Sequence, residues 1–158
     1  MSNESGRSLV EILGVLAIIG VLSIGGIAGY KLAVYRYTAS KIVDITNKYA
    51  FIVFERCRAV YDSHSTSLQS IDNCTKNTPG IPTFSEANIG NLPGALFENG
   101  ILFNRVSKDS NSNTHIIHST LKFKTKDLCL AVKYMQNIKN GCRESSAPYS
   151  IAVETKEN

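Results

Sequence analysis

The feature that most constrains this chain is an uncharged apolar stretch close to its N-terminus. No charged residue occurs from Ile12 to Tyr30, and Lys31 is the next one along the chain. The run from Ile12 to Gly29 has 18 residues, which is close to the length that an α-helix needs to cross a bilayer. The sequence therefore predicts a membrane-length helix followed by a separate domain.

Glu11 interrupts the apolar run near its beginning. A charge at the centre of a bilayer costs about 2.5–3.5 kcal/mol on insertion scales, and less near the interface. A carboxylate in this position therefore indicates a functional role, and we expect a cationic partner for it. The alternative is an interfacial carboxylate at the start of a helix, where the helix macrodipole favours negative charge.

The remainder of the chain has the size and composition of one modest domain. Of the 158 residues, about a hundred remain after the first 60, which is enough for one core. The formal net charge of +4 is mild, and no nucleic-acid recognition motif accompanies it. Specific binding of DNA or RNA is therefore disfavoured.

All four cysteines follow the apolar stretch, at positions Cys57, Cys74, Cys129 and Cys142. Their spacing matches no CxxC metal or redox pattern. An even number beyond a membrane segment favours disulfides in an oxidising compartment, with buried free thiols as the alternative. Of the three possible pairings we expect Cys57–Cys74 and Cys129–Cys142, because short loops close most easily.

The helical pattern continues beyond the apolar stretch. No proline occurs from Met1 to Asn77. Apolar or small residues recur at three- and four-residue steps, as in an amphipathic helix, at Leu32, Tyr35, Ala39, Ile42, Ile45, Tyr49, Ile52 or Val53, and Val60. We expect one helix from about Ser8 to about Tyr61, roughly 80 Å long. The alternative is a break at Gly25–Gly29 that separates two helices.

The C-terminal part predicts short elements after a long connection. Asp62–Asn99 is rich in serine, threonine, asparagine, glycine and proline, so it reads as a connecting region. The expected elements are a strand at Gly100–Val106, a turn at Ser107–Asn113, a strand within Thr114–Thr125, a short helix at Asp127–Asn137 and a last strand at Tyr149–Val153. The expected fold class is α+β, with a long N-terminal helix packed on a small antiparallel sheet.

No group of residues predicts an enzyme, a cofactor or a metal site. The sequence has no phosphate-binding loop, no dinucleotide-binding glycine pattern and no Ser/His/Asp arrangement with supporting motifs. His115 and His118 would project to opposite faces of a strand, which disfavours a shared metal ion. A modest basic cluster is formed by Lys122, Lys124, Lys126 and Lys133. We interpret it as a solvated face, with DNA capture as the alternative.

The N-terminal residues resemble a known leader. The segment Gly6-Arg7-Ser8-Leu9-Val10-Glu11, followed by Ile12–Ile19, is similar to the start of type IV pilins and type II secretion pseudopilins. That family has a short hydrophilic leader that ends in glycine, a cut after it, and a glutamate as fifth residue of the mature chain. A cut between Gly6 and Arg7 makes Glu11 the fifth residue. Arg7 stands where the family has phenylalanine or methionine, and the leader carries Glu4 in place of basic residues.

The resemblance implies a pathway of assembly. A membrane-embedded prepilin peptidase would cut after Gly6 and methylate the new amine of Arg7. Subunits would then stack by their N-terminal helices into a filament, on an inner-membrane assembly platform, as a homo- or hetero-polymer. Glu11 would pair with the Arg7 amine of a neighbouring subunit and set the axial register, because a buried charge with one partner cannot slide.

The resemblance also implies a layout and a location. The segments would be a leader at 1–6, a transmembrane or filament-core half of the helix at 7–30, an amphipathic half at 31–61 and a disulfide-stapled head at 62–158. Cys129–Cys142 would correspond to the C-terminal disulfide loop of many pilins. The chain would sit in a bacterial inner membrane before assembly and in a periplasmic or cell-surface filament afterwards.

A function of another class stays open. The chain could be an uncleaved single-pass anchor that presents an extracytoplasmic, disulfide-bonded binding domain. The basic residues Lys31, Arg36 and Lys41 follow the apolar run, and the positive-inside tendency alone would place the C-terminal part in the cytoplasm. The cysteines and the leader predict the opposite orientation, which we adopt.

Overall fold

The computed structural model describes residues 4–62, 71–91, 94–110, 114–138, 141–143 and 148–156. The chain divides into two compact units, Met1–Tyr37 and Thr38–Asn158. The first helix, α1 (Glu4–Asp62), has 59 residues and is assigned without interruption through the glycines at 25, 26 and 29. The expected single helix is therefore confirmed, and the alternative with a break at these glycines is not observed.

In the first unit the helix has no protein core to face. Every described side chain from Leu9 to Tyr37 is exposed. Large apolar residues are among them, with Ile24 exposed by 73 % and Val21 by 71 %. Apolar side chains at this exposure are unfavourable in water, since burial of one of them is worth about 1.5–3 kcal/mol. The apolar side chains of this unit therefore require an apolar environment.

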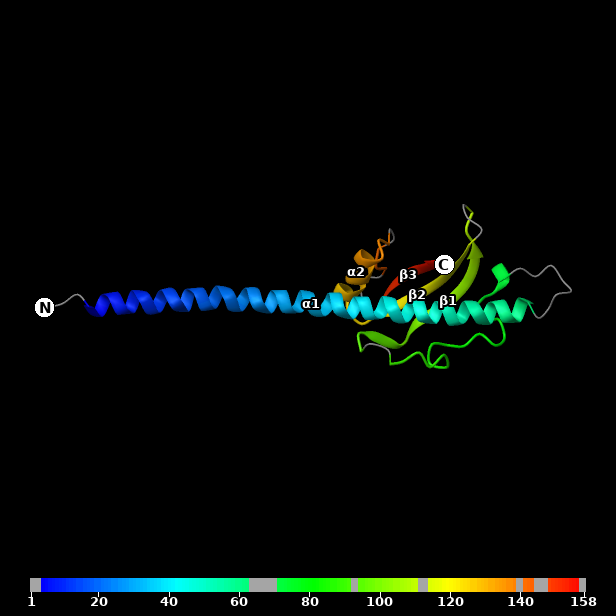
Figure 1. Ribbon diagram of the computed structural model, residues 1–158, viewed down its shortest axis with the longest axis horizontal. Coiled ribbons are helices and arrows are strands. Elements are labelled where there is room, and N and C mark those ends of the chain that lie inside the picture. Colours follow the sequence, from blue (N-terminus) through cyan, green and yellow to red (C-terminus); the bar gives the residue numbers. More distant parts are fainter. Residues whose placement is uncertain are drawn as a thin grey trace. The chain divides into compact units, whose positions relative to one another are not determined.

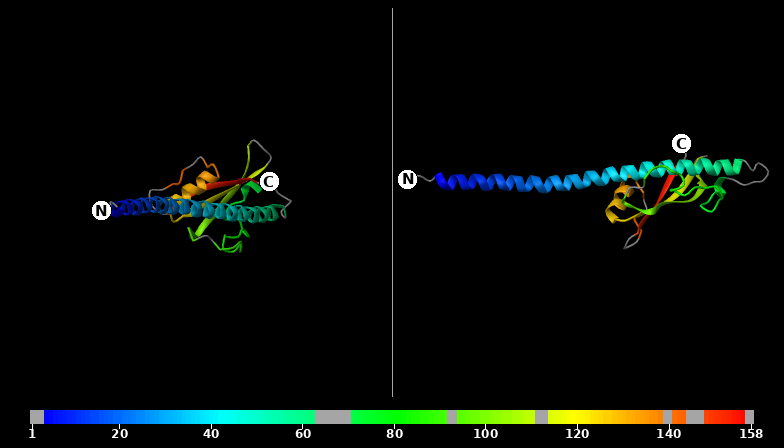
Figure 2. Two further views of the ribbon diagram at one scale, coloured as in Figure 1. Left: turned by 60° about the vertical axis from the view of Figure 1, so that its left-hand side comes forward. Right: turned by 90° about the horizontal axis from the view of Figure 1, so that it is seen from below.

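The second unit contains the domain core. On α1 the buried positions follow three- and four-residue steps at Ala39, Ile42, Thr46, Tyr49, Val53 and Cys57. Figure 1 shows this part of α1 beside three strands, and Figure 2 shows the strands on one side of it. The stripe and the inward residues of the strands form one apolar cluster.

The sheet is antiparallel, with strand order β1-β2-β3. The strands are β1 (Leu96–Lys108), β2 (His115–Phe123) and β3 (Tyr149–Lys156). Burial alternates along β2: Ile117, Ser119, Leu121 and Phe123 are buried on the core side, and the residues that alternate with them are half-buried. This architecture confirms the expected α+β class.

Several boundaries differ from the expected ones. Strand β1 begins at Leu96 rather than Gly100, because its register with β2 shifts between Leu96 and Ile101 and a bulge lengthens it. Ser107 and Lys108 belong to this strand rather than to the turn, whose residues 111–113 lie outside the described part. Strand β3 continues to Lys156 rather than ending at Val153.

The short helix and the connecting region complete the unit. Helix α2 (Lys126–Met135) ends two residues before the expected Asn137, which has a φ of 50° and so leaves the helical conformation. In the connecting region a 3₁₀ turn, η1 (Ile71–Asn73), precedes Cys74. The backbone N–H of Val106 donates to the carbonyl of Cys74 (3.0 Å), so this region lies along the outer side of β1.

Candidate functional site

The residues of the expected cleavage and assembly site lie at the start of α1. Gly6 and Arg7 fall within the helix, and Met1–Asn3 of the expected leader lie outside the described residues. Glu11 is exposed on the same helix, among the exposed apolar residues Val10 and Ile12. None of the ion pairs among the described side chains includes Glu11.

Helix α1 is long and apolar enough to cross a membrane. Its described part from Leu9 to Asp62 contains a window of mean hydropathy 2.4, and no residue of that window is buried within the protein. Ser23 donates its hydroxyl proton to the carbonyl of Ile19 (2.7 Å), so this polar group is satisfied within the helix. These features support membrane anchoring by the first unit.

Both disulfides lie in the second unit and join sequence neighbours. Cys57 on α1 pairs with Cys74, and Cys129 on α2 pairs with Cys142. Cys57, Cys74 and Cys129 are fully buried, whereas Cys142 is partly exposed. Disulfides of this kind are typical of extracytoplasmic domains. Each one fastens a loop to a helix, and the first fastens η1 and its surroundings to α1.

A second set of contacts holds the connecting region against α1. Tyr49 donates its hydroxyl proton to the carbonyl of Pro82 (3.0 Å), and its ring meets that of Phe84 edge to face at 5.6 Å. Burial, together with the charge of Glu86, raises the pKa of Tyr49 to about 12. Glu86 in turn accepts hydrogen bonds from the backbone and the hydroxyl of Thr83 (2.7 and 2.8 Å), and these bonds lower the pKa of its carboxyl.

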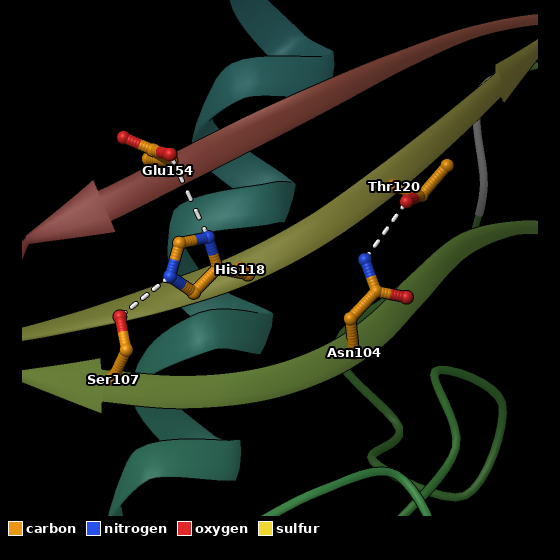
Figure 3. Close-up of polar contacts among 5 residues, drawn as sticks. All are labelled: Asn104, Ser107, His118, Thr120 and Glu154. Carbon is orange, nitrogen blue, oxygen red and sulfur yellow. Dashed lines mark hydrogen bonds and ion pairs between the residues drawn. The ribbon is translucent and has the colours of Figure 1, made fainter. Parts of the chain in front are cut away.

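A polar cluster lies on the face of the sheet that is turned away from α1 (Figure 3). It contains one residue from each strand. The Ser107 hydroxyl on β1 lies 2.7 Å from Nε2 of His118 on β2, and Nδ1 of the same ring lies 3.6 Å from Glu154 on β3. Nearby, Asn104 donates to the Thr120 hydroxyl (2.8 Å).

Desolvation governs the charge of His118. It lowers the pKa of the imidazole, Glu154 opposes this effect and Arg105 adds to it. The ring is therefore neutral at pH 7. The Ser107 hydroxyl and Nε2 share one hydrogen bond, and the tautomer of the ring determines which of the two donates.

The order hydroxyl, imidazole, carboxylate is also that of serine hydrolases. Here the carboxylate distance exceeds the 2.7–3.2 Å range of a hydrogen bond, and Glu154 is 64 % exposed. The groove found on the second unit touches Glu154 but neither Ser107 nor His118. We interpret the cluster as a cross-strand network that fixes the register of the sheet. The sequence did not predict this cluster, because its three residues come from three strands that are far apart along the chain.

His115 lies on the opposite face of β2, as its spacing from His118 predicts. Its Nε2 lies 3.8 Å from Asp72 of η1, and its ring lies 5.7 Å from that of Phe54 on α1. Among the described residues no group of three or more histidines, cysteines or carboxylates could hold a metal ion. The lysines at 122, 124, 126 and 133 are exposed or half-buried, and DNA capture by them stays a prediction.

A groove of about 720 Å³ runs between α1 and β3. One wall is a stripe of α1 side chains with Asn47, Phe51, Glu55 and Arg58, and the other is the end of β3 from Glu154 to Lys156. Phe51 is 65 % exposed in this groove, whereas Phe54 beside it is buried. The sequence did not predict the groove, because its walls come from α1 and β3, which are far apart along the chain.

No protein-family model, no curated protein and no solved structure matches this chain.

Proposed function

We propose that this chain is a prepilin-like structural subunit of a type IV pilus or a type II secretion pseudopilus. It is cleaved after Gly6, methylated on the amine of Arg7 and assembled into a helical filament. One observation carries the proposal: the charge-free segment of α1 from Ile12 to Tyr30, whose side chains are all exposed, follows a lone carboxylate at the fifth position after a glycine. The resemblance of this segment to prepilin leaders supplies the chemistry.

The exposed apolar helix fits a subunit that is transferred from a membrane into a filament core. In both surroundings its side chains are removed from water, which is favourable by about 25 cal/mol per Å² of apolar surface. In both, Glu11 needs a cation, and a free N-terminal amine on a neighbouring subunit would provide one. The pair of Glu11 and this amine would fix the axial register of neighbouring subunits, because apolar helices alone can slide along one another.

The competing function is an uncleaved anchor for a binding domain, and the N-terminus distinguishes the two. Mass spectrometry of the protein isolated from its native membrane is the decisive measurement. A mature chain that begins with N-methylated Arg7 supports the filament subunit. An intact Met1, or a cut near Gly25–Gly29, contradicts it and favours the anchored binding protein.

The proposed role of Glu11 in fixing the axial register makes a separate prediction. The variant Glu11→Ala removes the charge but keeps the apolar helix, so it should insert into membranes as the parent does and fail to assemble. Electron microscopy of sheared surface or periplasmic fractions measures filaments, and membrane fractionation measures insertion. Leu13→Ala, two residues further along the same exposed helix, is the control and should assemble. Normal filaments from Glu11→Ala would refute the register argument.

A further inference from the structure

The part of α1 from Tyr30 to Tyr37 directly follows the apolar run, and we refer to it as the basic aromatic segment. Its tyrosines and basic residues are Tyr30, Lys31, Tyr35, Arg36 and Tyr37. All five side chains are exposed, Tyr30 by 71 % and Tyr37 by 66 %. The segment lies in the first unit and contributes to neither the core nor the groove of the second. The membrane-length run is therefore followed by an exposed surface of aromatic and cationic groups.

The position of the segment along α1 matches the thickness of a bilayer. From Glu11 to Lys31 the helix advances by roughly 30 Å, which equals the thickness of a typical hydrocarbon core. From Tyr30 to Arg36 it advances by a further ~9 Å, enough to cross the headgroup layer of one leaflet, about 5–8 Å thick. When the apolar run spans a bilayer, the basic aromatic segment therefore lies at the depth of the lipid headgroups.

The tyrosine and basic side chains surround the helix rather than occupy one face. At about 100° per residue, Tyr30 and Tyr37 project from one side of α1. Lys31 and Tyr35 project from a second side, and Arg36 projects from a third. A protein that docks on the segment would contact one side, whereas a layer of headgroups contacts the whole circumference. The distribution of these side chains favours a lipid surface as the occupant.

The charges of the segment select the kind of lipid. No carboxylate occurs between Glu11 and Asp44, so Lys31 and Arg36 have no acidic neighbour close in the sequence. None of the ion pairs among the described side chains includes either of them. Tyrosine rings are typical of the boundary between hydrocarbon and headgroups. Two positive charges beside such rings complement headgroups that carry a net negative charge.

From this position, distribution and charge we propose that the basic aromatic segment binds the headgroups of anionic phospholipids at one surface of the bilayer. Lys31 and Arg36 donate hydrogen bonds to lipid phosphates, and the planar guanidinium of Arg36 holds one phosphate by two parallel bonds. The tyrosine rings lie at the edge of the hydrocarbon and fix the depth of the helix. This binding requires that the apolar run spans a bilayer, but it depends neither on cleavage after Gly6 nor on assembly into a filament.

The test uses the full chain in vesicles of phosphatidylcholine and phosphatidylglycerol in equal amounts. One of the two lipids carries a photoreactive group near the top of an acyl chain, and mass spectrometry of the digested protein locates the crosslinks after illumination. Phosphatidylglycerol should crosslink to residues 30–37 about tenfold more than phosphatidylcholine, because each basic residue near an anionic surface contributes a factor of about five. Equal crosslinking of the two lipids, or crosslinks that avoid this segment, overturns the proposal.

Two double variants separate a local site from the net charge of the protein. Lys31→Gln with Arg36→Gln should abolish the preference for phosphatidylglycerol and leave the chain inserted, because the apolar run is unchanged. The matched control is Lys48→Gln with Arg56→Gln, which removes two exposed charges of α1 in the second unit and should keep the preference. An equal loss in both would assign the preference to net charge and overturn the site.

Two further arms test the lipid surface itself. Excess inorganic phosphate at constant ionic strength should leave the preference unchanged, and its loss would indicate a site for free anions instead. Tyr30→Ala with Tyr37→Ala should spread the crosslinks beyond residues 30–37, since the rings no longer hold the helix at one depth. An unchanged crosslink map in this variant would contradict the role of the tyrosines.

Discussion

At the scale of single residues, Gly100 is the position where the backbone leaves no room. A Cβ atom there would lie 2.7 Å from the carbonyl oxygen of Phe97 and 2.8 Å from Cβ of Leu96. Both are too close for van der Waals contact, so the bulge that lengthens β1 requires glycine. Gly100→Ala should lower the free energy of unfolding by about 1–3 kcal/mol, as overpacking does. Urea unfolding followed by circular dichroism measures it.

The control for this variant is Gly141→Ala, because a Cβ atom at Gly141 meets nothing within 4 Å. It should unfold at the same urea concentration as the parent chain. Equal stability of the two variants would mean that the bulge at Gly100 accommodates a side chain, in contradiction to the argument.

His118 is the residue whose charge links stability to pH. Desolvation is the largest cause of its lowered pKa, so the folded protein binds a proton there less readily than the unfolded chain does. Its contribution to stability is complete above the unfolded pKa of about 6.5 and is lost as the pH falls through the lower folded value. Stability should therefore decrease from pH 7 towards pH 5, and His118→Gln should flatten this slope.

An NMR titration of the imidazole C–H resonances gives the pKa of His118 directly. It should lie below 6.5 in the parent protein. In Glu154→Gln it should fall further, since Glu154 is the charge that raises it. A value at or above 6.5 in the parent would show that the ring is not desolvated.

At the scale of elements, the two disulfides differ in access. Both sulfurs of Cys57–Cys74 are fully buried, whereas Cys142 is partly exposed. Thiolate reagents must reach a sulfur atom in line, so Cys129–Cys142 should be reduced first under mild dithiothreitol. Alkylation and mass spectrometry over time measure the order, and earlier loss of Cys57–Cys74 would contradict it. Replacing either pair by alanine should cost about 2–5 kcal/mol.

The elements also show which parts of the fold could be predicted from the sequence alone. The 3.6-residue pattern between Leu32 and Val60 predicted α1, since a long helix is determined by local periodicity. The start of β1 was missed, because the register shift around Gly100 depends on contacts with β2. For the same reason the Ser107–His118–Glu154 cluster was not predicted: its members come from three strands and meet only through register.

At the scale of the whole molecule, the two units differ in whether their apolar side chains are buried within the protein. The first exposes an apolar helix, and the second has a core of its own from Ala39 to Val153. Membrane association should therefore depend on the first unit alone. An arginine at the centre of a spanning helix costs about 2.5–3.5 kcal/mol, so Ile18→Arg should lower the inserted fraction by about a hundredfold in a liposome flotation assay. Ser23→Ala is the control and should float as the parent does, because the Ser23 hydroxyl is bonded only within the helix. Undiminished flotation of Ile18→Arg would mean that this helix does not enter the bilayer.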